Sequence, residues 1–460
     1  MVALLWRGSA ADDARSIADA ASQAGREDDA FGWDPSQREE LERRAALGTS
    51  HVLYALSPGG VEATAERTEA WRGEIERAAE RHDVDPDRLE AVVFLESAGR
   101  PDVIAGETPE AASGLAQIIP STATDLLDME VDLVRSVKLT KRIGRAERDG
   151  KSKRAARLRR ERARIDERFD PAAALAGAAR YLAIAQERFG VADLATVSYH
   201  MGIGNLESVI DAYGNGDGLS YAQLFFDTAP DRNPEAHGIL AGFADDSSLY
   251  LWRVLASQRI MERWRADRGA LRSDIELATA KATLEELYHP EEATEVFAEP
   301  DDVAAATEDG TLLPLPAGED AEGLGWRTDP QMGELAPRLD REPSLYRGLR
   351  PEALAVLSYI GGRVRSLSGA ERPLRVTSSV RDQAYQDLLV GSNPEATHAY
   401  SLHTTGYSFD VLREYENDLQ AEAFQFVLDR LRALAVIDYA REPRAIHVTV
   451  SPLGAELLAP

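Results

Sequence analysis

The 460-residue chain contains no cysteine, few aromatic residues and too little positive charge to balance its acids. Without cysteine, neither disulfide bonds nor thiolate metal ligands can contribute to fold or function. The 52 lysine and arginine residues are outnumbered by 79 aspartate and glutamate residues, which gives a formal net charge of -27. A general DNA or RNA binder is therefore excluded, because neutralising nucleic-acid phosphates requires a net basic surface.

Long apolar segments are missing as well. No run reaches the roughly 20 apolar residues that a membrane helix needs, so we predict no transmembrane segment. The apolar start, Met1 to Trp6, is shorter than the apolar core of about 7 to 15 residues in a signal peptide. We expect that a signal has been removed or that export is not encoded in these residues.

The remaining composition is that of a multidomain globular protein. It is 44% hydrophobic and 28% charged, and one hydrophobic core rarely serves more than about 250 to 300 residues. Helical patterns dominate the first half, and an acidic stretch with proline and glycine separates it from a mixed second half. We predict a helical leader (1–60), a helical domain (61–265), an acidic connector (266–344) and a small α+β domain (345–460).

Glu96 stands out because it occupies the apolar face of a predicted helix. Leu89, Val92, Val93 and Glu96 follow the spacing i, i+3, i+4 and i+7, so the carboxyl group points into the same layer as the hydrophobes. Burial disfavours the anion and raises the carboxyl pKa, which suits a general acid near neutral pH. Cleavage of a glycosidic bond requires such an acid.

Four segments then carry a family resemblance, in the expected order. They are Glu96–Pro101 (Glu-Ser-Ala-Gly-Arg-Pro), Gly114–Ala123 (Gly-Leu-Ala-Gln-Ile-Ile-Pro-Ser-Thr-Ala), Asp170-Pro171 with the helix that follows, and Tyr199–Asn205 (Tyr-His-Met-Gly-Ile-Gly-Asn). Together they resemble the soluble lytic transglycosylases, which have a lysozyme-like fold, over about residues 64–265. His200 and Ala116 depart from this family's usual asparagine and methionine.

The resemblance implies roles for particular residues. Glu96 would protonate the glycosidic oxygen and then, as a carboxylate, deprotonate the muramic acid C6 hydroxyl, which closes a 1,6-anhydro ring. Tyr199 would hydrogen-bond the acid or its neighbourhood, and Gln117 would reach an N-acetyl group, with Ser97 also at the substrate. Tyr199 taken alone is equally compatible with a helix-end aromatic. A hydrolase would need a second carboxylate, but Asp102 follows the helix end, where a solvated turn residue is favoured.

An exceptionally basic run, 134–168, interrupts this domain. Fifteen of the 52 basic residues lie between Arg135 and Arg168, and Gly150 divides the run into two helical arms. We predict an inserted basic helical hairpin. One interpretation is that this hairpin binds anionic wall polymer or stem-peptide carboxylates. The other is that it is a solvated helical hairpin without a ligand.

The second domain carries a pattern typical of metal ligands. Ser401–Asp410 reads Ser-Leu-His-Thr-Thr-Gly-Tyr-Ser-Phe-Asp, which resembles the Ser-x-His-x-x-Gly-x-Ala-x-Asp segment of zinc D-alanyl-D-alanine carboxypeptidases and their lysostaphin and hedgehog relatives. The resemblance, over about 345–455, implies that His403, Asp410 and His447 bind Zn²⁺ and leave a fourth position for water. Arg381 resembles the arginine that binds the substrate carboxylate in these families. The alternative is three unrelated polar residues.

A general base for this second site is not obvious. Relatives have an acid three residues before the last ligand or a histidine two before it, and here those positions hold Arg444 and Ala445. Glu442 is the nearest candidate and His398 a weaker one. A zinc domain that binds stem peptides without cleaving them therefore remains an alternative.

The two resemblances point to one polymer. We interpret the chain as a secreted, periplasmic or cell-envelope lytic transglycosylase that cleaves between N-acetylmuramic acid and N-acetylglucosamine, joined to a zinc peptidase-like domain for stem peptides. The expected partners are peptidoglycan glycan strands and stem peptides. The alternative is a wall-binding scaffold that positions assembly partners, with a non-catalytic zinc domain.

Overall fold

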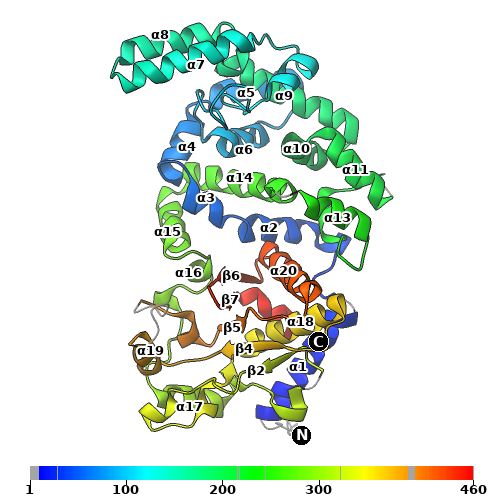
Figure 1. Cartoon of the computed structure of the whole chain (residues 1–460), viewed down its shortest axis with the longest axis vertical. Helices are drawn as coiled ribbons and strands as arrows, with labels where there is room; N and C mark the ends of the chain where they lie inside the picture. Colours follow the sequence, from blue (N-terminus) through cyan, green and yellow to red (C-terminus); the bar gives the residue numbers. More distant parts are fainter. Residues whose placement is uncertain are drawn as a thin grey trace. The chain divides into compact units, whose positions relative to one another are not determined.

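The structure, a computed structural model, describes residues 10–27, 29–214, 216, 218–243, 245–321, 323–391 and 399–458. The chain forms two compact units (Figure 1). One unit consists of residues 38–275. The other combines residues 1–37 with residues 276–460, so it is built from both ends of the chain.

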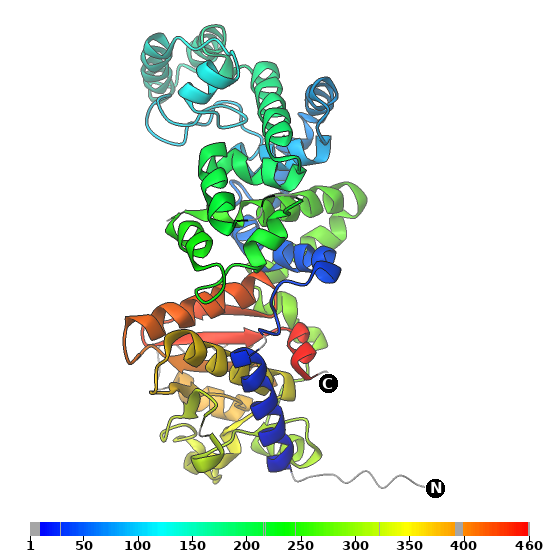
Figure 2. The ribbon, with the colours of Figure 1, turned by 90° about the vertical axis from the view of Figure 1, so that its right-hand side faces the viewer.

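These units differ from the predicted domains at two places. The predicted leader, 1–60, is divided between the units, and most of the predicted connector, 266–344, belongs to the second one. The first helix, α1 (Ala10–Glu27), packs along α18 (Pro351–Ser368), and Figures 1 and 2 both show the two helices side by side. Small residues permit this approach: a Cβ at Gly362 would lie 2.3 Å from the Ser22 carbonyl oxygen.

In the described part of unit 38–275, the regular elements are helical. The helices are α2 (Arg38–Gly48), α3 (His51–Leu56), α4 (Val61–Glu69), α5 (Arg72–His82), α6 (Pro86–Ser97), α7 (Leu133–Arg148), α8 (Ser152–Ala163), α9 (Pro171–Phe189), α10 (Ala192–Met201), α11 (Ile203–Tyr213), α12 (Tyr221–Phe226), α13 (Pro234–Gly242) and α14 (Tyr250–Ala266), with a short π-helix at Thr122–Leu126. Helix α15 (Arg268–Thr279) runs past the boundary of the unit. Leu89 and Val93 of α6 are fully buried in the core, together with Leu115 and Leu175.

Helix α6 has the ends that its sequence predicts. The Asp85 side chain accepts a hydrogen bond from the Asp87 amide, and Pro86 occupies the first turn, where no amide donor is needed. At the other end Ala98 takes a left-handed conformation with φ 53° and closes the helix one residue before Gly99. The last turn therefore presents Glu96 immediately before the chain reverses.

Unit 1–37 with 276–460 is an α+β structure. Its helices are α1, α16 (Glu285–Tyr288), α17 (Pro300–Asp309), α18, α19 (Gln383–Val390) and α20 (Asp418–Ala433). Its strands are β1 (Leu313–Pro314), β2 (Trp326–Thr328), β3 (Gly348–Leu349), β4 (Leu374–Ser378), β5 (Ser408–Leu412), β6 (Ile437–Arg441) and β7 (Ala445–Val450). Strands β1 and β3 form a two-stranded sheet, and the other five form a sheet in the order β2-β4-β5-β7-β6. Only the pair β2 and β4 is parallel.

The register of β5 and β7 brings two predicted metal ligands together. Asp410 of β5 lies directly opposite His447 of β7, and the neighbouring pair on the same face is Ser408 and Thr449. The alternate residues of β7, such as Ile446 and Val448, are buried. Helices α18 and α20 pack against β7 and β6, respectively. The sheet thus places its polar residues on one face.

No described helix combines the length and the low charge that crossing a membrane would require, as the sequence predicted.

Candidate active site and candidate metal centre

Glu96 lies in a setting that favours its protonated form. Burial raises its pKa to about 7, although the hydroxyl of Tyr250 opposes this shift by donating a hydrogen bond of 2.7 Å to Oε1 of Glu96. Among the residues that the structure describes, no second carboxylate contributes to the shift. One carboxyl group can therefore be both a proton donor and, after transfer, a proton acceptor near neutral pH.

Tyr250 was not found by sequence reasoning. It opens α14, it is buried, and its ring stacks on the ring of His200 at a centroid distance of 5.1 Å. The sequence pattern around Tyr250 is helical, but nothing in a single sequence shows that this tyrosine reaches Glu96. His200, which departs from the usual asparagine of the resembled family, is thus tied to the acid through Tyr250.

Tyr199 lies near Glu96, and its hydroxyl contacts the residue before Gln117, but the hydrogen bonds of Tyr199 and Gln117 go to the backbone and not to the acid. The Tyr199 hydroxyl donates a 2.7 Å hydrogen bond to the carbonyl of Ala116, the residue before Gln117. The Gln117 amide nitrogen donates to the carbonyls of Val103 and Gly114. Tyr199 therefore fixes the loop that carries Gln117, and the Gln117 side chain is oriented by that loop.

Ser97, which the resemblance places at the substrate, is buried at the end of α6, and its substrate contact stays a prediction. Ser97 is 1% exposed, and its hydroxyl donates a 3.1 Å hydrogen bond back to the carbonyl of Val93. This hydrogen bond occupies the Ser97 hydroxyl within the last turn of α6. Ser97 thus helps to close α6.

The Gly114 loop is held by a buried arginine. A Cβ at Gly114, where φ is +81°, would lie 1.7 Å from the Arg168 carbonyl oxygen, so only glycine fits. The Arg168 guanidinium is fully buried, pairs with Asp166 at 2.8 Å and donates to the carbonyls of Pro109 and Ile118. Arg168 is therefore a structural residue of this loop and not part of an exposed basic surface.

Asp102 is an exposed turn residue, as predicted, and it also has ion-pair partners. Its carboxylate forms ion pairs of 3.0 Å with Arg159 and 2.9 Å with Arg162, both from α8. The Arg162 guanidinium also lies 3.5 Å over the ring of Phe169. These contacts engage Asp102 with the basic hairpin, which leaves Glu96 as the acid at the end of α6.

Comparison with known families now bears on this helical unit. Residues 74–141 and 150–221 match the family model described as the transglycosylase SLT domain. Both matched segments lie within the helical unit. No curated protein matches the chain. The SLT match supports the predicted lytic transglycosylase activity on peptidoglycan.

The matched residues include Glu96, Gln117 and Tyr199 and end before Tyr250. Between 74 and 221 the match leaves out only 142–149, around the tip of the hairpin. Most of the run predicted as an insert is therefore spanned by the SLT match. The hairpin itself has the two predicted helices, α7 and α8, on either side of Gly150.

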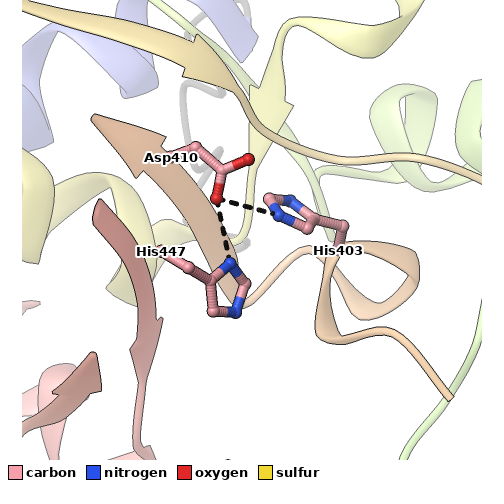
Figure 3. Close-up of side chains that lie close together, drawn as sticks. All are labelled: His403, Asp410 and His447. Atoms are coloured by element: carbon pink, nitrogen blue, oxygen red, sulfur yellow. Dashed lines mark hydrogen bonds and ion pairs between the residues drawn. The ribbon is translucent and has the colours of Figure 1, made fainter. Parts of the chain in front are cut away.

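In the other unit, His403, Asp410 and His447 converge (Figure 3). Their ligand atoms all lie within 4.8 Å of one another. Oδ1 of Asp410 lies 3.2 Å from Nε2 of His403 and 2.9 Å from Nδ1 of His447. Two imidazoles and a carboxylate at this separation form a donor set that could hold a metal ion.

The far side of each imidazole ring has its own partner. Nδ1 of His403 lies 2.8 Å from the Ser379 carbonyl oxygen, so it donates there and leaves Nε2 free of its proton. Nε2 of His447 lies 3.3 Å from Oε2 of Glu285, and Glu285 also pairs with Lys281 at 2.6 Å. Such outer partners orient metal-binding histidines. Glu285 and Lys281 come from the predicted connector, in which the sequence had shown no chemistry.

Burial and neighbouring charged groups shift the pKa values of all three residues in this cluster. Burial lowers the pKa of His403 to about 4, and the neighbouring Arg381 acts in the same direction. Burial would also lower the pKa of His447, but hydrogen bonds to Asp410 and Glu285 outweigh it and raise the value to about 10. The pKa of Asp410 lies well below its usual value, against the effect of burial, because of His403 and His447. The carboxylate is therefore ionised at neutral pH, as a metal ligand must be.

A cavity of about 360 Å³ adjoins the three residues, and its lining includes both Arg381 and Glu442. Arg381 donates hydrogen bonds to Ser378 at 2.6 Å and to Gln386 at 2.9 Å, and it lies 3.5 Å from Asp410. The structure thus gathers both residues that sequence reasoning had placed near the histidines. His398, the weaker candidate for a base, lies outside the described residues.

Proposed function

We propose that the helical unit is a lytic transglycosylase that cleaves the bond between N-acetylmuramic acid and N-acetylglucosamine and forms 1,6-anhydro-N-acetylmuramic acid. The observation that carries this proposal is the solitary Glu96 carboxyl within a matched SLT domain, with its pKa raised to about 7. An acid with this pKa is about half protonated near neutral pH, so it can deliver a proton and then accept one.

Each step of the proposed reaction uses an atom of this chain. Protonated Glu96 gives its proton to the glycosidic oxygen, and the bond to the anomeric carbon of muramic acid breaks. The carboxylate then takes the proton of the C6 hydroxyl, whose oxygen bonds to the anomeric carbon and closes the ring. The Tyr250 hydroxyl, 2.7 Å from Oε1 of Glu96, stabilises the carboxylate between these steps.

The test is mass spectrometry of purified peptidoglycan digested with the full-length protein. We expect 1,6-anhydromuropeptides with the wild type and at least a hundredfold fewer with Glu96→Gln, which keeps the shape of the side chain but has no transferable proton. Reducing-end muramic acid products in place of anhydro products would show hydrolysis and contradict the ring closure.

For the second unit we propose a Zn²⁺ site formed by Nε2 of His403, a carboxylate oxygen of Asp410 and Nδ1 of His447. The donor set supports this, because each imidazole has an outer partner that leaves the proposed ligand atom facing Asp410. A bound zinc ion would polarise a substrate carbonyl and lower the pKa of a bound water. Arg381 would bind a peptide carboxylate at the cavity wall.

We propose that this unit acts on peptidoglycan stem peptides, with Glu442 as the general base. Glu442 lines the cavity next to the three predicted ligands, which supports the assignment. The competing function is stem-peptide binding without cleavage, within a wall-binding scaffold. Arg444 favours this alternative, since relatives have an acid at that position.

Metal analysis and peptide products separate these possibilities. We expect about one zinc per chain, lost in His403→Ala. Peptide-bond cleavage in wild type but not in Glu442→Gln, with zinc retained, would establish the base. Retained cleavage in Glu442→Gln would exclude Glu442, and zinc without any cleavage in the wild type would establish the binding function. Both proposed substrates belong to the cell wall, so we place the protein in the periplasm or at the cell surface.

A further inference from the structure

In the hairpin of α7 and α8, apolar side chains lie between the two helices and charged side chains lie on the outer surface. The helices pack on each other through Leu139, Ile143, Ala146, Ala155 and Leu158, which form one buried cluster. Figures 1 and 2 show the two helices side by side. Helical geometry directs the residues on the opposite faces of both helices away from this cluster.

Those opposite faces carry ten exposed cationic side chains, here called the basic stripes. They are Lys138, Lys141, Arg142, Arg145 and Arg148 on α7, and Lys153, Arg154, Arg157, Arg160 and Arg164 on or directly after α8. Steps of one, three or four residues keep each stripe on one side of its helix, with a positive charge on average about every 4 Å along the helix axis. The whole chain has a net charge of -27, so this concentration of positive charge is local.

No residue of the basic stripes forms an ion pair with a described residue of the chain. The ion pairs of the hairpin involve other cations instead: Arg135 with Asp132, Lys151 with Asp149, Arg159 with Asp102 and Glu147, and Arg162 with Asp102. Like charges spaced three or four residues apart repel one another and destabilise a helix. An anionic ligand on the stripes would remove this repulsion.

The composition of the hairpin limits the kind of ligand. Residues 133–164 contain no phenylalanine, tyrosine or tryptophan, so there is no platform for stacking sugars or nucleic-acid bases. Val134 is the one large hydrophobe of the hairpin that is strongly exposed, so the surface lacks the apolar face that enters a bilayer. The ligand must therefore be held by its charges, as a linear polyanion is.

We propose that the basic stripes bind a linear phosphodiester polymer of the cell envelope. Seven of the ten cations are arginine, whose planar fork matches phosphate oxygens. A phosphodiester polymer carries a charge in every repeat unit, whereas stem-peptide carboxylates branch from every second sugar, so the closely spaced stripes fit the former. The ion pairs of Asp102 tie this binding arm to the loop that follows the Glu96 helix.

Binding of labelled poly(glycerol phosphate) to the full-length protein, measured between 50 and 200 mM salt, tests the proposal. The hairpin variant is Arg142→Gln with Arg145→Gln, Arg157→Gln and Arg160→Gln. The matched control changes four exposed arginines elsewhere in the same unit: Arg77→Gln, Arg81→Gln, Arg188→Gln and Arg272→Gln. Glutamine is a good helix former, so both variants are expected to retain the circular dichroism spectrum of the wild type.

We expect wild-type affinity to fall steeply with salt, because counterions are released on binding. The hairpin variant should bind at least tenfold more weakly at 50 mM salt and with a shallower salt slope, and the control should stay within twofold of the wild type. Equal loss in both variants, or no loss in the hairpin variant, would overturn the proposal.

Competition defines the ligand class. Poly-L-glutamate and duplex DNA, added at equal charge concentration, should each displace the probe less effectively than unlabelled poly(glycerol phosphate) does. More effective displacement by polyglutamate would identify a carboxylate site, and by DNA a nucleic-acid site, and either would overturn the proposal. The cell-envelope location rests on the proposed function. The binding itself does not, since Glu96→Gln should bind the probe as the wild type does, whether or not the enzyme forms anhydro products.

Discussion

At the scale of single residues, the proposed chemistry depends on a pair that lies 154 positions apart in the sequence. Glu96 supplies the proton, and Tyr250 supplies the hydrogen bond that stabilises the carboxylate. Burial raises the pKa of Glu96 and this hydrogen bond lowers it, with the result at about 7. Removing the Tyr250 hydroxyl should therefore shift the pH range in which the enzyme is active toward higher pH.

Tyr250→Phe removes the hydrogen bond and keeps the ring. Because the lost bond favours the anion, the pKa of Glu96 should rise, and the alkaline limb of the pH profile of kcat/KM should move from near pH 7 to higher pH. The carboxylate is less stabilised, so kcat should fall about tenfold. Glycan-strand digestion across pH 5 to 9 measures both effects.

Tyr213→Phe is the matched control for this profile, because its hydroxyl donates to Asp227 and not to Glu96. We expect it to leave the alkaline limb in place. An unchanged limb in Tyr250→Phe, or a shift to lower pH, would contradict the assigned role of Tyr250.

Glu285 gives a second prediction at the residue scale. It contacts Nε2 of His447 and also Lys281, so Glu285→Gln should leave His447 less well oriented for zinc. We expect zinc affinity to fall about 10- to 100-fold, as competition with a chelator would measure. The neighbouring Glu286→Gln serves as the control, because Glu286 pairs with Lys281 at 3.5 Å, whereas His447 pairs with Glu285. Equal zinc affinity in Glu285→Gln and wild type would show that Glu285 does not support the zinc site.

At the scale of elements, local sequence was often sufficient. The helical pattern of the sequence over Pro171–Phe189 coincides with α9, because Asp170 caps its start and Gly190 takes the left-handed conformation that ends it. The strand-like pattern at Ala445–Val450 coincides with β7. The sequence also has a helical pattern from Thr64 to His82, but the chain forms two helices there, α4 and α5, with a break at Ala70 and Trp71. The helical pattern continues through that break, so periodicity could not reveal it.

The attachment of the hairpin gives a prediction at this scale. Asp102→Asn removes the charge that pairs with Arg159 and with Arg162, whose side chain is only 3% exposed. A buried guanidinium without its counterion is costly, so the free energy of unfolding should drop by about 1 to 2 kcal/mol in urea denaturation. Glu74→Gln breaks only the exposed pair with Arg77 and should cost about 0.5 kcal/mol or less. Similar losses in both variants would contradict a structural role for Asp102.

At the scale of the whole molecule, sequence reasoning placed the two types of fold but not the limits of the units. The apolar pattern of α1 indicates that one face is buried, but it does not say that the partner is α18, more than 300 residues away. Connector residues such as Glu285 and Trp326 were missed for the same reason. Trp326 is fully buried and begins β2, which pairs with β4. Contacts between distant segments are set by tertiary packing, which local patterns do not encode.

The proposed function joins two chemistries in one chain, and the Glu96 reaction is its central claim. Mass spectrometry of purified peptidoglycan, digested in parallel by wild type and Glu96→Gln, tests that claim most directly. The account predicts 1,6-anhydromuropeptides from the wild type and at least a hundredfold fewer from the variant. Equal amounts from both proteins, or no anhydro products from the wild type, would contradict it.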